Sequence, residues 1–125
     1  MIVLCHSLLK KELSLIARDQ EIRKQMRKAV EKIRGGLGTH LKGVDFPASR
    51  LVKTPFTSRR GAGRILFLIL IKKDYYVPLL LRFKNDKEIG ENMSWENFSF
   101  RRILRSHLDL AENDIAKDAF TSINP

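Results

Sequence analysis

The chain has 125 residues, of which 43% are hydrophobic and 30% are charged. These proportions fit one ordinary globular domain and exclude a wholly disordered chain. The unusual quantity is the charge: 24 lysine and arginine residues against 14 acidic residues give a net charge of +10 at pH 7. A domain this basic usually binds a polyanion, such as RNA, DNA, an anionic membrane surface or an acidic protein.

The positive charge is concentrated in the first two thirds of the chain. Residues 1–87 hold 20 basic and seven acidic residues, whereas residues 88–125 hold four and seven. The single cysteine, Cys5, cannot form an internal disulfide, and the N-terminus does not make a convincing signal peptide, so a cytoplasmic location is expected. The longest uncharged apolar run, residues 65–71, is too short to span a bilayer, and no membrane partner is expected.

Two helices are predicted near the N-terminus, over residues 8–18 and 20–34. The second is the clearer, because its apolar residues recur at helical spacing: Ile22, Met26, Ala29, Val30 and Ile33. Asp19 is a suitable N-cap, and Gly35 with Gly36 ends the helix. Six cations occupy the opposite face, which is either simply solvated or steers a polyanion toward the protein.

Residues 35–63 are rich in glycine and proline and predict loops. One short strand is expected over residues 50–53, ended by Pro55, and a flexible basic loop follows over residues 57–64. Residues 65–71 are rich in β-branched side chains and predict a strand buried on both faces, with residues 75–81 returning as its hairpin partner. Pro78 indicates an edge position or a β-bulge in that second strand.

Residues 99–120 predict a final helix, since apolar residues recur there at helical spacing. The order of elements is therefore helix, helix, strand, strand, strand, helix. This order predicts an α+β domain, with two N-terminal helices packed on a small twisted antiparallel sheet and a helix at the C-terminus. Residues 2–5 could add a further short strand.

Several kinds of site receive no support. His6, His40 and His107 lack the spacing of metal ligands, and Cys5 lies in an apolar stretch that suits a small buried residue, so neither a metal nor a cofactor is expected. The glycines at 35–38 end a helix and those at 61–63 precede a strand, so both groups suit turns better than a phosphate-binding loop.

A group of cations surrounds the predicted hairpin. It comprises Arg50, Lys53, Arg59, Arg60, Arg64, Arg82, Lys84 and Lys87. The start of one antiparallel strand lies beside the end of its partner, so Arg64 should neighbour Arg82 and Lys84, and Lys53 could join them. Residues 46–73 contain no carboxylate that could neutralise the group. The group predicts a phosphate-binding site, and the alternative is a generic basic surface.

Three segments resemble the RelE/ParE toxin superfamily. In residues 51–64, a strand ending in Lys53 leads through a basic, glycine-rich stretch to Arg64. In residues 81–94, an aliphatic strand is followed by a Lys-Asn-Asp-Lys turn and an Asn-Met-Ser segment, and residues 40–43 follow the amphipathic helix as His-Leu-Lys-Gly. The resemblance covers about residues 8–95 of a single domain spanning 1–125, with residues 96–125 as a C-terminal helical extension.

The resemblance implies the toxin of a type II toxin–antitoxin pair, held inactive by a cognate antitoxin protein. RelE-like members are endoribonucleases (mRNA interferases) that cut mRNA, commonly on the ribosome and without a metal, through attack of the 2′-OH on the adjacent phosphate. That reaction needs a base, a cation for the phosphate charge and an acid.

Matched position by position, the resemblance implies a catalytic trio and a set of RNA contacts. Arg64 would stabilise the phosphate, Lys53 would act as base or phosphate contact, and Lys84 as acid or stabilising group. The implied RNA-binding residues are Arg50, Arg59, Arg60, Arg82 and Lys87. Two other functions stay open: a ParE-like toxin that inhibits DNA gyrase without cutting RNA, and a basic RNA-binding module with no activity.

Overall fold

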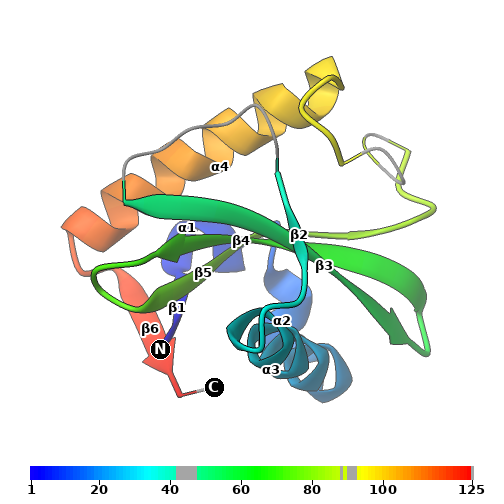
Figure 1. Cartoon of the computed structure of the whole chain (residues 1–125), viewed down its shortest axis with the longest axis horizontal. Coiled ribbons are helices and arrows are strands. Elements are labelled where there is room, and N and C mark those ends of the chain that lie inside the picture. Colours follow the sequence, from blue (N-terminus) through cyan, green and yellow to red (C-terminus); the bar gives the residue numbers. More distant parts are fainter. Residues whose placement is uncertain (42–47, 88, 90–92, 125) are drawn as a thin grey trace.

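The computed structural model describes residues 1–41, 48–87, 89 and 93–124 and contains a six-stranded sheet with helices on both faces (Figure 1). The predicted α+β class is confirmed. The sheet is mixed, however, and not antiparallel as predicted, because its N-terminal strand runs parallel to one neighbour. Residues 42, 43 and 90–92, which contribute to the family resemblance, lie outside the described residues.

The strands follow the order β2-β3-β4-β5-β1-β6. Their bounds are β1 (Ile2–Cys5), β2 (Thr39–His40), β3 (Ser49–Ser58), β4 (Gly61–Leu70), β5 (Tyr75–Phe83) and β6 (Phe120–Ile123). β1 lies between β5, to which it is parallel, and β6, to which it is antiparallel. All four residues of β1 are buried, which explains their uniformly apolar character. The suggested strand over residues 2–5 is thus confirmed, whereas β6 was not predicted.

β3 and β4 pair over ten residues and join through a two-residue turn, Arg59 and Arg60. The predicted flexible loop over residues 57–64 is therefore wrong. The turn is tight because Gly61 adopts a φ of +117°, a conformation that costs glycine little. The Ser58 hydroxyl also stabilises the turn, accepting from the Arg60 N–H and donating to the Gly61 carbonyl, both at 3.1 Å.

Pro55 lies within β3 and does not end it, contrary to the sequence prediction. The Leu41 N–H donates to the Leu51 carbonyl at 2.9 Å, so the odd-numbered residues of β3 direct their backbone groups away from β4. Among the described residues, β2 pairs with β3 at Val52 and Lys53. The position of the missing N–H of Pro55 points away from β4, so no hydrogen bond between β3 and β4 is lost.

The hairpin of β4 and β5 contains the bulge that Pro78 indicated. Phe67 pairs with Pro78, whereas Leu66 pairs with Leu80, so one extra residue is accommodated in β5. Residues 65–69 of β4 are all buried, as expected for a strand covered on both faces. This hairpin places the end of β5 beside the start of β4, with Arg82 directly opposite Arg64.

The described part of the chain contains four helices. They are α1 (His6–Leu9), α2 (Ser14–Arg18), α3 (Gln20–Arg34) and α4 (Phe98–Ala116). α3 has the predicted bounds, and the Asp19 carboxylate caps it by accepting from the N–H groups of Glu21 and Ile22 at 2.9 and 3.3 Å. α2 and α3 lie on one side of the sheet and α4 on the other (Figure 1). None of the helices in the described part of the chain is long and apolar enough to cross a membrane.

The predicted helix over residues 8–18 is broken into α1 and α2. The Leu13 N–H donates to the Leu8 carbonyl at 2.8 Å, which closes a wider turn than an α-helix allows. Leu8 and Leu13 are both fully or almost fully buried, although a continuous helix would point residues five apart in different directions. Breaking the helix buries both leucines and turns Glu12 toward β5.

α4 ends four residues earlier than predicted, because the chain reverses at Asp118 (φ 57°) and enters β6. Its buried Asp114 accepts from both the backbone N–H and the hydroxyl of Ser7 at 2.8 Å. These bonds attach α4 to α1 and compensate for burying the carboxylate.

Candidate phosphate-binding site

Lys53 and Arg64 lie on the same face of the sheet. Lys53 is paired with Leu66, and Arg64 precedes Leu66 by two residues, so strand alternation makes the two cations diagonal neighbours. The Lys53 Nζ donates to the Met93 carbonyl at 2.9 Å, close to the start of α4. This face is therefore the one that α4 partly covers, opposite α3.

The environment of Lys53 weakens its hold on a proton. Burial is the larger cause and the positive charge of Arg64 the second, and together they lower the pKa of Lys53 below its ordinary value. The nearby carboxylate of Glu96 opposes this effect without cancelling it. Lys53 thus has a larger neutral fraction near pH 7 than a free lysine, which is the property that a general base requires.

Lys84 follows β5 and comes close to Arg64 along the backbone. Its N–H donates to the Ala62 carbonyl at 3.0 Å, and Ala62 precedes Arg64 by two residues. The side chain of Lys84 is exposed. The structure therefore brings Arg64 and Lys84 together at the end of β5. Lys53 lies in the middle of β3, which continues to Ser58 and does not end at Lys53 as the resemblance implied.

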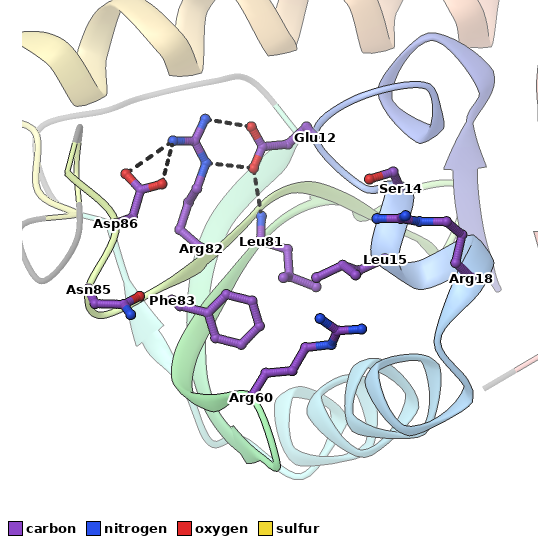
Figure 2. Close-up of a pocket in the computed structure, with 10 residues that line it drawn as sticks. All are labelled: Glu12, Ser14, Leu15, Arg18, Arg60, Leu81, Arg82, Phe83, Asn85 and Asp86. Carbon is purple, nitrogen blue, oxygen red and sulfur yellow. Dashed lines mark hydrogen bonds and ion pairs between the residues drawn. The ribbon is translucent and has the colours of Figure 1, made fainter.

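Arg82 is directly opposite Arg64, but its charge is balanced inside the protein (Figure 2). Its Nη2 and Nε atoms contact the two Glu12 carboxylate oxygens at 2.7 and 2.8 Å, and its Nη1 lies 3.3 Å from Asp86. The Arg82 and Glu12 side chains are only 15% and 6% exposed. A bidentate, nearly buried pair of this kind has a structural role, because it links β5 to Glu12, and it presents little free charge to a ligand.

Glu12 connects three parts of the fold. Besides Arg82, its carboxylate accepts from the Leu81 N–H at 3.1 Å and contacts the His107 Nε2 of α4 at 3.0 Å. Burial alone would raise the pKa of Glu12, but the hydrogen bonds from Arg82 and His107 outweigh it and lower that pKa. The sequence analysis missed this network, because it placed Glu12 on a continuous helix and considered His107 only as a metal ligand.

Arg59 and Arg60 contact the start of α3. The Arg60 Nε lies 2.9 Å from an Asp19 carboxylate oxygen, and the Arg59 Nε lies 3.7 Å from Glu21. The hydrogen bond from Arg60 is the main cause that lowers the pKa of Asp19. The expectation of a basic group without neutralising carboxylates is therefore wrong: Glu12, Asp19, Glu21 and Asp86 all come from outside residues 46–73.

Arg50 and Lys87 do not join the Lys53–Arg64 pair. Arg50 is exposed and precedes Lys53 by three residues in β3, so its side chain leaves the opposite face of the sheet. Lys87 is exposed in the segment after β5.

A pocket of about 410 Å³ opens at the end of β5. Figure 2 shows its lining, which is formed by Glu12, Ser14, Leu15, Arg18, Arg60, Leu81, Arg82, Phe83, Asn85 and Asp86. The Glu12–Arg82–Asp86 network forms one wall. The charges of this network are already paired with one another, so the positive charge that the pocket presents to a ligand comes from Arg18 and Arg60 and not from Arg82.

Cys5 is unsuited to nucleophilic chemistry. It is fully buried, as the sequence indicated, and burial, followed by the charge of Asp114, raises the pKa of its thiol to about 12. The thiolate form is therefore negligible at neutral pH.

No family model, curated protein or solved structure matches the chain. The functional interpretation consequently depends on the residues and geometry described above.

Proposed function

We propose that the chain is a RelE-like toxin that cuts mRNA on the ribosome in the cytoplasm, and that a cognate antitoxin neutralises it. The observation that carries the proposal is the Lys53–Arg64 pair: a partly buried lysine with a lowered pKa beside an arginine, on one face of the sheet. This combination supplies a base and a phosphate-binding cation. Both groups are required when a 2′-OH attacks the adjacent phosphate.

In the proposed reaction, neutral Lys53 removes the proton from the 2′-OH. The 2′-oxygen then forms a bond to the adjacent phosphorus, and the bond from phosphorus to the 5′-oxygen breaks. Arg64 binds the phosphate oxygens with its planar guanidinium while negative charge accumulates on them. Lys84 donates a proton to the departing 5′-oxygen. The products are a 2′,3′-cyclic phosphate and a free 5′-hydroxyl, and Arg82 keeps a structural role.

The antitoxin would cover this face with acidic side chains, because charge complementarity to the Lys53–Arg64 pair both attracts the partner and excludes RNA. A complex in which Lys53, Arg64 and Lys84 all stay open to solvent, with no catalytic segment displaced, would contradict this part of the proposal.

Induced expression followed by primer extension on cellular mRNA tests the proposal. The wild-type chain should arrest growth and produce cuts in phase with codons. Arg64→Ala should lower the cleavage rate by about 10²–10³ and abolish the arrest. It should change the free energy of unfolding by no more than about 1 kcal/mol, since β4 is anchored by its apolar residues.

Lys72→Ala is the control, because it removes one positive charge from an exposed position outside the proposed site. Its cleavage should equal that of wild type. A folded Arg64→Ala protein that remains fully toxic would remove Arg64 from the site. Growth arrest with a DNA-damage response and no mRNA cuts would favour the gyrase-directed alternative, and the absence of both would favour an inactive RNA-binding module.

A further inference from the structure

The exposed face of α3 carries a second concentration of positive charge. Five of its exposed side chains are basic: Lys24, Arg27, Lys28, Lys32 and Arg34. They span the eleven residues from Lys24 to Arg34, and the ten steps between these two give about 15 Å at the rise of an α-helix. Glu31 is the one exposed carboxylate on the described helix within that span.

The acidic residues at the start of α3 do not balance this charge. Asp19 contacts Arg60 at 2.9 Å and Glu21 contacts Arg59 at 3.7 Å, so the β3–β4 turn already neutralises both. Arg23 has a different role, donating to the carbonyls of Ile16 and Ala17 at 2.9 and 2.8 Å at the end of α2. The remaining five cations therefore form a separate surface, which we call the α3 basic face.

We infer that the α3 basic face binds the phosphate backbone of double-stranded RNA. Residues 20–34 contain no aromatic side chain, whereas proteins that hold single strands rely on aromatic rings that stack the bases. A row of lysines and arginines instead contacts phosphates without reading sequence. Double-stranded RNA is recognised in this way, by the shape of its backbone.

The rigidity of α3 supports binding to a regular duplex. Ile22, Met26 and Val30 are completely buried beneath the helix, so its backbone is fixed before any ligand arrives. A rigid row of cations loses little conformational entropy when it contacts an equally regular row of phosphates.

The α3 basic face and the Lys53–Arg64 pair lie on opposite sides of the sheet. Figure 1 shows α3 on one side and α4 on the other, and Lys53 contacts the segment that leads into α4. Duplex binding therefore needs none of the residues assigned to cleavage. Only the choice of RNA over DNA rests on the proposed function.

Fluorescence anisotropy of the purified full chain with an RNA duplex of about 16 base pairs tests the inference. The test variant is Lys24→Gln/Arg27→Gln/Lys28→Gln. The control, Lys72→Gln/Lys73→Gln/Lys117→Gln, removes the same charge from exposed positions outside α3. The test variant should bind at least about tenfold more weakly, with a slope of log K against log salt that is shallower by about two to three. The control should lose less than about threefold, and circular dichroism should show that both variants fold.

Equal losses in the two variants would overturn the inference in favour of diffuse charge. Tighter binding to a single strand or to duplex DNA of the same length would overturn the choice of double-stranded RNA. So would a wild-type protein that does not bind the RNA duplex at about 50 mM salt but does bind an acidic polypeptide. The readout is equilibrium binding, whereas the proposed function is read from cuts in mRNA. A failure of either proposal is therefore visible independently of the other.

Discussion

At the scale of single residues, the proposed role of Lys53 as a base depends on its surroundings. Burial and the Arg64 charge both favour its neutral form, so the rate of mRNA cleavage should rise with pH and level off below the pH expected for a free lysine. Lys53→Arg should abolish this rise, because arginine stays protonated throughout. Single-turnover cleavage measured between pH 6 and about 10 checks this, taking the upper limit from the ordinary lysine range.

The same Lys53→Arg protein can contradict the assignment of Lys53 as the base. If it cleaves RNA with the wild-type pH profile, then another group is the base and Lys53 only contacts phosphate.

The environment of Thr54 leads to a prediction about stability. Its side chain is 1% exposed, and among the described residues its hydroxyl has no hydrogen-bond partner. A buried hydroxyl without a partner costs free energy, so Thr54→Val should leave stability unchanged or raise it by up to about 1 kcal/mol in urea unfolding. Thr57→Val, at an exposed position of the same strand, is the control and should stay within about 0.5 kcal/mol. A loss above about 1 kcal/mol at Thr54 would mean that the hydroxyl is bonded in solution.

At the scale of elements, the Glu12–Arg82–His107 network holds α4 and the α1–α2 segment against β5. Arg82→Met would leave the Glu12 carboxylate buried without its main partner, which should cost about 3–5 kcal/mol in urea unfolding. Adding Glu12→Gln removes the buried, unpaired negative charge and keeps an acceptor for the Leu81 N–H. The double variant should therefore be more stable than Arg82→Met alone. Lys87→Met, at an exposed position, should change little. Additive losses in the double variant would show that the two charges are not coupled.

The elements that the sequence predicted well are those with a strong local pattern. α3 has an apolar stripe, an Asp cap and a glycine stop, so its position follows from residues within it. The apolar run of β4 likewise predicts residues 65–70, whereas the first four residues of β4 were predicted as loop. The break between α1 and α2 and the strand β6 depend on distant partners. Leu8 and Leu13 must reach a common core, and β6 exists because it pairs with β1. Neither requirement is visible in a short stretch of sequence.

The same distinction applies to the candidate site. The proximity of Lys53 and Arg64 follows from the alternation and pairing of adjacent strands, which is a local property of the sequence. The neutralisation of Arg82, Arg59 and Arg60 does not, because Glu12, Asp19 and Glu21 lie about 40 to 70 residues away and reach these arginines only through packing of α2 and α3. Counting charges within one segment therefore overstated the free positive charge around the hairpin.

At the scale of the whole molecule, the net charge of +10 and the paired carboxylates together predict sensitivity to acid. The pKa of Glu12 is below its ordinary value of 4.5 in the folded protein, and that of Asp19 is lowered as well. Such a group stabilises the fold fully above its unfolded pKa, and that stability is lost as the pH falls through the folded pKa. Protonating carboxylates also increases the repulsion among the 24 basic residues.

Urea unfolding at several pH values from 7 down to about 3, in low and high salt, separates these two causes. Repulsion among exposed cations is screened by salt, so high salt should restore part of the stability lost in acid. The contribution of the nearly buried Glu12–Arg82 pair is screened much less and should remain lost. Glu12→Gln should therefore be less stable than wild type at pH 7 but should lose less stability between about pH 5 and pH 3, because one titrating group has been removed. If wild type and Glu12→Gln lose stability in parallel over this range in high salt, the Glu12 carboxylate is not a source of the acid sensitivity, and general charge repulsion accounts for it.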